Sequence, residues 1–213
     1  MGSTWIVIPI KAVDGAKQRL SAALSPCQRL HLARQLAGNS IAACLGCSLA
    51  DKVLVVAGDP EVAEMACSMG AEVLGEATAQ GQSSALETGI GYAVGRGAQS
   101  VLLISADLPL LTTDVVSALL AGGQSRRPPA AVAAPAIGRQ GTNALFLNPP
   151  QALALHFGDA SLPKFQAEAR SKGIPFDLYE DPALALDLDE HEDLKTLASI
   201  SPQQLQRLAD LSC

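Results

Sequence analysis

Short apolar runs alternate with longer helical patterns along the whole 213-residue sequence. Runs rich in Val, Ile and Leu at 5–10, 52–57 and 101–104 are typical of buried strands. The segments between them begin with residue pairs that favour helix starts, such as Ser25-Pro26 and Asp59-Pro60. Because strands that alternate with helices form mostly parallel sheets covered on both faces, the sequence predicts an α/β fold.

The remaining elements follow the same alternation. Further strands are expected at 72–74, 130–134 and 144–147, and helices at 25–46, 59–70, 83–95, 113–123, 161–173, 190–200 and 202–211. The strands at 130–134 and 144–147 are close in sequence, which indicates a small antiparallel element, and 178–186 is expected to be a connection. A chain of this length most often folds as one domain, so 1–213 is expected to be a single domain.

The net charge of −6 limits the expected partners. An acidic protein is poorly suited to nucleic acid, and anionic substrates would need metal ions, helix N-termini and a few well-placed cations. No apolar run approaches the length of a membrane span, and the first ten residues lack the basic start of a secretory signal. The sequence therefore predicts a cytoplasmic enzyme that binds neither nucleic acid nor membrane.

Five cysteines are present, and Cys44 and Cys47 have the spacing of a metal or redox motif. A structural zinc site needs four nitrogen or sulfur ligands, and no second pair with this spacing follows in the sequence. The two cysteines also fall near the end of an Ala-rich helical pattern. We therefore interpret them as small core residues rather than as a functional pair.

Three aspartates follow apolar segments. Asp107 comes just after the strand predicted at 101–104, and Asp187 and Asp189 follow the apolar stretch 183–186. Open α/β sheets bind ligands at the C-terminal ends of their strands, and Mg²⁺ is held by one or two carboxylates together with substrate phosphates. If the segment with Asp187 lies beside that of Asp107, the three form a magnesium site. Each aspartate taken singly is better explained as a turn or helix-cap residue, and the basic loop described next favours the metal site.

The first predicted strand leads into a basic loop. Lys11, Lys17 and Arg19 place three cations within nine residues, against one acid, Asp14. A cationic loop after the first strand is where a nucleotide triphosphate would bind. The loop lacks the Gly-Lys-Ser/Thr of a Walker motif, and a solvated basic loop is the alternative.

Later loops also carry polar residues. The segment 75–84 is rich in Gly, Gln and Ser, so that Gly81 permits close backbone approach and Ser84 offers a hydroxyl to a base. Thr142 and Ser161 offer further hydroxyls, and Ser161 lies at a predicted helix N-terminus, where N–H groups favour a phosphate or carboxylate. Each of these residues could also be an ordinary cap or turn residue.

Five short phrases occur in an order that resembles a known family. They are Pro-x-Lys…Ala-Lys-x-Arg-Leu-Ser, Ala-Asp-Leu-Pro-Leu-Leu, Gly-Thr-Asn-Ala-Leu, Phe-Gly-x-x-Ser and Asp-x-Asp…Glu-Asp-Leu, and they span 8–194. Together they resemble the guanylyltransferases of coenzyme F-420 biosynthesis, which act on 2-phospholactate, phosphoenolpyruvate or 3-phosphoglycerate. The resemblance implies a nucleotidyltransferase fold, related to glycosyltransferase type A, with GTP as substrate and Mg²⁺ as cofactor.

The same resemblance implies roles for individual residues. Those that look like metal ligands are Asp107, Asp187 and Asp189. Those expected to act on the reacting phosphates are Asp107, Lys17 and Arg19. Those that look like nucleotide-binding residues are Lys11, Lys17, Arg19, Gly81 and Ser84. Those that look like acceptor-binding residues are Thr142, Gly158 and Ser161.

The chain departs from the family pattern at two places. The loop that usually reads Gly-Leu-Asn is Gly81-Gln82-Ser83, and the segment before Thr142, usually glycine-rich with an acid, contains Arg139. Arg139 could bind an acceptor carboxylate or phosphate through two hydrogen bonds. A more polar site would suit the extra hydroxyl of 3-phosphoglycerate, which needs a partner when buried. The acceptor therefore stays open among the three phospho-acids.

The reaction expected from the resemblance is in-line displacement at the α-phosphorus of GTP by an acceptor phosphate oxygen, with pyrophosphate leaving. A downstream phospholactate-type transferase would consume the reactive product, and a homodimer is common on such scaffolds. The alternatives are a molybdopterin guanylyltransferase, a cytidylyltransferase, a nucleotide-sugar glycosyltransferase and a non-catalytic GTP sensor. The first usually has a Gly-rich signature where this chain has Pro9-Ile10-Lys11, and the three aspartates argue against a sensor.

Overall fold

A seven-stranded sheet forms the centre of the molecule in the computed structural model, which describes residues 2–13, 15–75, 82–138 and 140–209. The strand order is β3-β2-β1-β4-β6-β5-β7. The strands are β1 Thr4–Ile10, β2 Lys52–Ala57, β3 Glu72–Gly75, β4 Ser100–Ile104, β5 Ala130–Pro135, β6 Thr142–Asn148 and β7 Phe176–Leu178. Only β6 runs antiparallel to its neighbours among these strands, so the predicted, mostly parallel sheet is confirmed.

The first strand shows why the predicted strands are apolar at nearly every position. Alternate side chains of a strand point to opposite faces of its sheet. Ile6 and Ile8 of β1 are buried on one face, and Trp5 and Val7 are buried on the other. A parallel strand that helices cover on both sides therefore needs a continuous apolar run.

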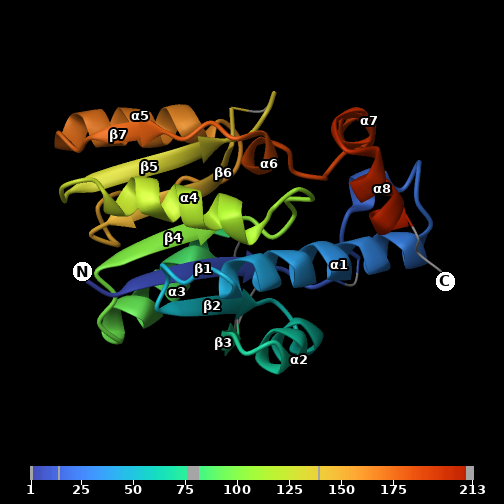
Figure 1. Cartoon of the computed structure of the whole chain (residues 1–213), viewed down its shortest axis with the longest axis horizontal. Helices are drawn as coiled ribbons and strands as arrows, with labels where there is room; N and C mark the ends of the chain where they lie inside the picture. Colours follow the sequence, from blue (N-terminus) through green and yellow to red (C-terminus); the bar gives the residue numbers. More distant parts are fainter. Residues whose placement is uncertain (1, 14, 76–81, 139, 210–213) are drawn as a thin grey trace.

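Helices cover both faces of this sheet (Figure 1). The face of Ile6 and Ile8 is covered by α1 Pro26–Leu45, α2 Pro60–Ser68 and α4 Thr113–Gln124, and the other face by α3 Gln82–Gly95 and α5 Ser161–Lys172. The predicted helix starts are confirmed, because the Ser25 and Asp59 side chains each accept a backbone N–H of the following turn. In the described ranges no helix is both long and apolar enough to cross a membrane.

A leucine cluster holds the last helices against the beginning of the fold. The short helices involved are η1 Gln18–Leu20, α6 Pro182–Ala185, α7 His191–Ile200 and α8 Pro202–Ala209. Leu188 and Leu197 pack with Leu20 of η1 and Leu36 of α1. In Figure 1, α7 and α8 lie beside one end of α1 and the loop that follows β1. This packing brings the predicted acidic segment at 187–189 next to the predicted basic loop.

Two elements differ from the expectation. The segment 178–186, expected to be a connection, contains the last residue of β7 and the single turn of α6. The sequence does not predict β7, because three residues are too few for an alternating pattern and only the pairing with β5 makes them a strand. The predicted antiparallel element is confirmed, because β6 lies in the sheet between β4 and β5 and runs antiparallel to both.

The closely spaced cysteines are part of the core. Cys44 and Cys47 are both free thiols and both buried, one in α1 and one just after it. Burial, with a smaller contribution from Cys47, raises the pKa of the Cys44 thiol well above its usual range. A thiol that stays protonated is a poor nucleophile and metal ligand, which agrees with the interpretation of Cys44 as a packing residue. The burial of Cys47 agrees with the same role for that residue.

Candidate functional site

The chain changes direction across the sheet between β1 and β4. From β1 the chain continues to α1 and β2 on one side, whereas β4 leads to α4 and to strands on the other side. Open α/β sheets bind their ligands beyond the C-terminal ends of the strands at such a point. A cavity of about 560 Å³ lies there, bordered by Ile10 at the end of β1 and by Ser105 just after β4.

This cavity brings together most of the predicted site residues. Those that line it are Lys11, Lys17, Arg19, Asp107, Thr142, Gly158, Ser161, Asp187 and Asp189. Ser84 lies in the first turn of α3 and is not one of the lining residues. Gly81 and Arg139 lie outside the described residues. Most of the predicted site residues therefore lie around one cavity, while their individual roles stay predictions.

Lys17 lies between two of the three aspartates. Its Nζ is 2.9 Å from Oδ2 of Asp107 and 3.6 Å from Oδ1 of Asp189, and its side chain is only 10% exposed. The Lys17 backbone has a φ of 55°, a left-handed conformation that non-glycine residues seldom adopt. A partly buried cation in this position reduces the repulsion between the two carboxylates. The basic loop is thus part of the acidic site rather than a solvated loop beside it.

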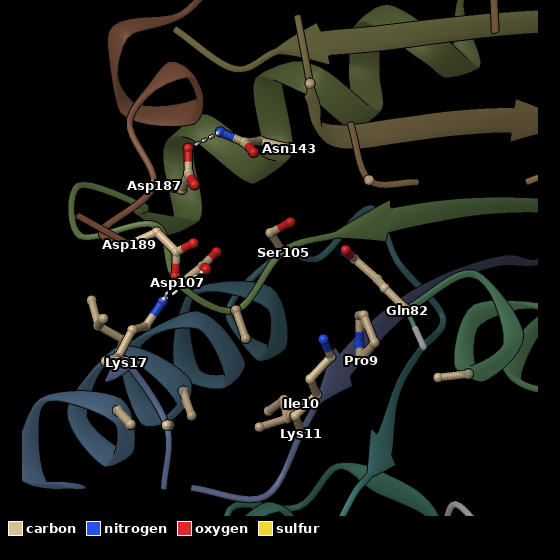
Figure 2. A pocket seen from close by; sticks show the side chains of 18 of the residues that line it. Pro9, Ile10, Lys11, Lys17, Gln82, Ser105, Asp107, Asn143, Asp187 and Asp189 are labelled. Carbon is tan, nitrogen blue, oxygen red and sulfur yellow. Dashed lines mark hydrogen bonds and ion pairs between the residues drawn. The ribbon is translucent and has the colours of Figure 1, made fainter. Parts of the chain in front are cut away.

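Arg19 and Lys11 lie nearer the rim of the cavity. Nη1 of Arg19 is 3.3 Å from Asp189 and 3.2 Å from Glu190, with 67% of the Arg19 side chain exposed. Lys11 is exposed just past β1, and it lies near Pro9 on the opposite side of the cavity from Asp187 (Figure 2). These two cations are accessible to an anionic ligand that enters the cavity.

The two segments that carry the carboxylates lie side by side. The Leu188 N–H donates to the carbonyl of Asp107 over 3.0 Å. The magnesium-site prediction required this arrangement, because Asp187 and Asp189 flank Leu188. The carbonyl of Ala106 in addition accepts a hydrogen bond from the Ser40 hydroxyl of α1, which holds the Asp107 loop against that helix.

Asn143 contacts Asp187 and is not among the site residues predicted from the sequence. Its Nδ2 lies 3.4 Å from Oδ1 of Asp187 and 2.9 Å from the carbonyl of Leu184 (Figure 2). Asn143 is buried in the second position of β6 and lines the cavity. The available sequence signal is its place in the phrase Gly-Thr-Asn-Ala-Leu, of which only the threonine is among the predicted acceptor-binding residues.

The carboxylates suit a hard cation, but they do not form a complete ligand set. Across the described ranges, no group of three His, Cys, Asp or Glu side chains could hold a metal ion. The ammonium of Lys17 already contacts Asp107 and Asp189. Since Mg²⁺ is commonly held by one or two carboxylates plus phosphate oxygens and water, these residues fit an ion that arrives with a phosphate ligand better than a site built by protein alone.

Two buried hydroxyls occupy another part of the cavity. Oγ of Ser161 is 3.1 Å from Oγ1 of Thr142, and these residues are 0% and 5% exposed. Ser161 is the first residue of α5, so the positive end of that helix dipole lies at the cavity. The loop before it turns at Gly158, whose φ of +117° requires glycine. Hydroxyls and a helix N-terminus are groups that bind phosphates and carboxylates.

Comparison with known proteins decides which family this site belongs to. The model of the family described as "Guanylyl transferase CofC like" matches residues 4–200. The chain belongs to this family. It is 40% identical over 196 residues to the phosphoenolpyruvate guanylyltransferase of Rubrobacter xylanophilus, and the alignment covers 92% of this chain and 93% of the relative. It is 34% identical over 209 residues to the 3-phospho-D-glycerate guanylyltransferase of Colwellia psychrerythraea, covering 98% and 97%.

A solved structure shows the same fold. A nucleotidyl transferase from Methanothermobacter thermautotrophicus matches with a TM-score of 0.67 at 13% identity, covering 96% of this chain and 98% of that one. The predicted nucleotidyltransferase fold and the resemblance to the guanylyltransferases are both confirmed. As a member of the CofC-like family the chain is a nucleotidyltransferase enzyme, which sets aside the sensor and the glycosyltransferase among the alternatives.

Proposed function

We propose that this CofC-like protein transfers GMP from GTP to the phosphate of a three-carbon phospho-acid in coenzyme F-420 biosynthesis, with release of pyrophosphate. The observation that carries the proposal is one cavity lined by two chemically different groups. One group is the cation and carboxylates of Lys17, Asp107 and Asp189, and the other is the pair of hydroxyls of Thr142 and Ser161. Two anionic substrates that must react with each other need such neighbouring sites.

GTP would occupy the end of the cavity near β1. Lys11, Lys17 and Arg19 supply positive charge there for the triphosphate, and Pro9 and Gln82 border the space available to the base. Gln82 carries both a donor and an acceptor, which suits the edge of a purine. Gly81 and Ser84 remain predicted nucleotide contacts.

The phospho-acid would occupy the end of the cavity near α5. Thr142 and Ser161 offer hydroxyl groups, and the backbone at Gly158 allows a close approach of the acid. Relatives are named for phosphoenolpyruvate and for 3-phospho-D-glycerate, so both acids, together with 2-phospholactate, are candidates. Arg139 remains a predicted contact with the acceptor.

Mg²⁺ bound with GTP would act as a Lewis acid and neutralise charge on the phosphates, and Asp107, Asp187 and Asp189 are the residues that would hold it. The Nζ of Lys17 lies 2.9 Å from Asp107, where it can bind the departing pyrophosphate. Two unit charges of the same sign about 4 Å apart repel by roughly 4 kcal/mol at an effective dielectric constant near 20. Neutralising the repulsion between the two anionic substrates would therefore lower the activation barrier substantially. A phosphate monoester is mostly ionised near neutral pH, and the attack therefore needs no side-chain base.

The fate of the product, the oligomeric state and the cellular location are also proposals. The product, a diphosphate diester that joins the acid to guanosine, is reactive, and we expect a phospholactate-type transferase to consume it. A homodimer and a cytoplasmic location are expected from the scaffold and the sequence, and each is open to a direct measurement by sedimentation or by cell fractionation.

The test is pyrophosphate release from GTP and Mg²⁺ with phosphoenolpyruvate, 2-phospholactate or 3-phosphoglycerate in parallel, with a coupled transferase to trap the product. We expect release with one acid to exceed that with the others and to require GTP rather than CTP. Reactions without acceptor and with the Asp107→Ala variant are the controls. Binding of GTP without release in any of the three reactions would contradict the proposed acceptor class.

A further inference from the structure

Asn143 connects both carboxylate segments of the site to strand β6. Its backbone carbonyl accepts the N–H of Ser105 over 2.9 Å, and Ser105 begins the loop that leads to Asp107. Its side-chain amide donates to the carbonyl of Leu184 and contacts Asp187, which belong to the other segment. A single residue thus holds the two acid-bearing segments in a fixed relation to the sheet.

The side chain of Asn143 is buried, and its amide nitrogen faces several hydrogen-bond acceptors. Its exposed fraction is 6%, and its Nδ2 faces three acceptors, at 2.9 Å from Leu184 O, 3.4 Å from Ala185 O and 3.4 Å from Asp187 Oδ1. An amide nitrogen has only two hydrogens, so these three acceptors share them. A buried amide in this position is costly unless its donors are satisfied, which favours one orientation of the side chain and of its neighbours.

The position of Asn143 in β6 explains why its side chain contacts the carboxylate part of the site. Neighbouring residues of a strand point to opposite faces, so Thr142 and Asn143 diverge at the start of β6. Thr142 meets Ser161 of α5, whereas Asn143 meets the turn of α6, which packs on the opposite face of the sheet. The beginning of β6 therefore aligns the hydroxyl part of the cavity with the carboxylate part.

We propose that Asn143 is a positioning residue that holds the carboxylate of Asp187 toward the cavity, where it takes part in binding the metal ion that accompanies GTP. This inference rests on the proposed function and adds a residue to its site. The amide is neutral, so it orients the carboxylate without removing the negative charge that a cation needs (Figure 2). Residues that hold metal ligands in this manner typically change metal affinity or activity by about 10- to 100-fold when replaced.

The test uses two changes at Asn143 and the same two changes elsewhere in β6. Asn143→Asp keeps the shape of the side chain but replaces the amide nitrogen by an oxygen, which would face the three acceptor oxygens. Asn143→Ala removes the N–H donors without adding charge. The matched controls are Asn148→Asp and Asn148→Ala, at the far end of the strand and outside the cavity lining. Mn²⁺ serves as the probe, because it prefers the same oxygen ligands as Mg²⁺ and its free form is measured by electron paramagnetic resonance.

Binding of Mn²⁺ is measured with GTP present and acceptor absent, below the melting temperature of every variant. We expect both Asn143 variants to bind Mn²⁺ about 10- to 100-fold more weakly, while affinity for GTP without metal changes little and both Asn148 variants resemble the wild type. A purely structural role would lower the melting temperature but leave the Mn²⁺ affinity of the folded protein unchanged. If one Asn143 variant does not fold, the other still decides the outcome.

Three results would overturn the inference. They are wild-type Mn²⁺ affinity in a folded Asn143 variant, an equal loss in the Asn148 variants, and no binding of Mn²⁺ by the wild type with GTP. Pyrophosphate release by the wild type is measured separately and tests the proposed function. If the wild type releases pyrophosphate and the Asn143 variants bind Mn²⁺ normally, only the role of Asn143 is contradicted. If the wild type releases no pyrophosphate and the Asn143 variants bind Mn²⁺ more weakly, only the proposed reaction is contradicted.

Discussion

The ammonium of Lys17 and the carboxylate of Asp107 form an ion pair in the site cavity, although the two residues are 90 positions apart in sequence. The pair is partly buried and adjoins Asp189, so its charges act on whatever binds there. An ion pair in such a place contributes more to binding and catalysis than an exposed pair, because less water screens it.

Replacement of Lys17 by methionine is expected to lower kcat/KM for pyrophosphate release by about 10²- to 10³-fold, since it removes a charge that stabilises the departing phosphates. Methionine keeps the length of the side chain without the ammonium. The control is Lys52→Met, which breaks an exposed pair with Glu72 outside the cavity. Similar kinetics for the Lys17 variant and the control would show that Lys17 is only structural.

Asp107→Ala is expected to abolish turnover while the protein stays folded. The carboxylate of Asp107 is half-buried and lines the cavity, whereas its carbonyl makes the structural hydrogen bond with Leu188, which the change retains. Turnover is measured by pyrophosphate release and folding by circular dichroism and thermal melting. Asp114→Ala, at an exposed position in the first turn of α4, is the matched control. Near-normal activity in the Asp107 variant would remove the metal site as described.

Ser161→Ala is expected to raise KM for the phospho-acid by about tenfold, because Thr142 and the substrate would each lose a partner in a buried place, at a cost of about 1 to 2 kcal/mol. KM for GTP should change little, since the hydroxyl belongs to the proposed acceptor site. Initial rates at varied concentrations of each substrate separate the two constants. Ser171→Ala, on the exposed end of the same helix, is the control; an equal rise in KM for GTP would argue against an acceptor site at Ser161.

Two glycines of α3 provide a stability test. A Cβ at Gly89 would lie 2.7 Å from Val7 and 2.9 Å from Val56, whereas one at Gly91 would meet nothing within 4 Å. We expect Gly89→Ala to lower the free energy of unfolding by about 1 to 3 kcal/mol through overpacking. Gly91→Ala should raise it by about 0.5 to 1 kcal/mol, because alanine favours the helix. Urea unfolding measures both, and a stabilised Gly89 variant would contradict the packing of α3 on the sheet.

Glu168 is expected to make stability depend on pH. Burial raises the pKa of this carboxyl, but hydrogen bonds from the Ala154 N–H, Lys172 and His156 outweigh it, so the net pKa is lowered. A lowered pKa gives stability that is present above the unfolded-state value of about 4.3 and is lost as pH falls through the folded-state value. Glu168→Gln should therefore lower the free energy of unfolding by about 1 to 2 kcal/mol at neutral pH.

The difference between Glu168→Gln and the wild type should shrink as the pH falls through the lowered folded-state pKa of Glu168, because the protonated glutamate is then neutral like glutamine. Unfolding by urea at a series of pH values measures it. Glu87→Gln, at an exposed position of α3, is the control and should show little difference at any pH. A difference that stays constant down to acid pH would mean that the carboxylate charge of Glu168 is not what stabilises the fold.

The sequence by itself determined the elements whose causes are local. Continuous apolar runs predicted β1, β2 and β4, because a strand buried on both faces must be apolar throughout. Ser25 and Asp59 predicted helix starts, because a cap acts within one turn. Short motifs likewise indicated site residues, most of which line the cavity, including Asp107 and Thr142.

Only the tertiary structure decided how these parts meet. The strand β7 exists because β5 pairs with it, and three residues alone carry no pattern. Lys17 reaches Asp189, and Asn143 reaches Asp187, because the leucine cluster under α7 and α8 brings the end of the fold onto its beginning. Such contacts depend on the packing of segments far apart in sequence, and local propensity carries no information about them.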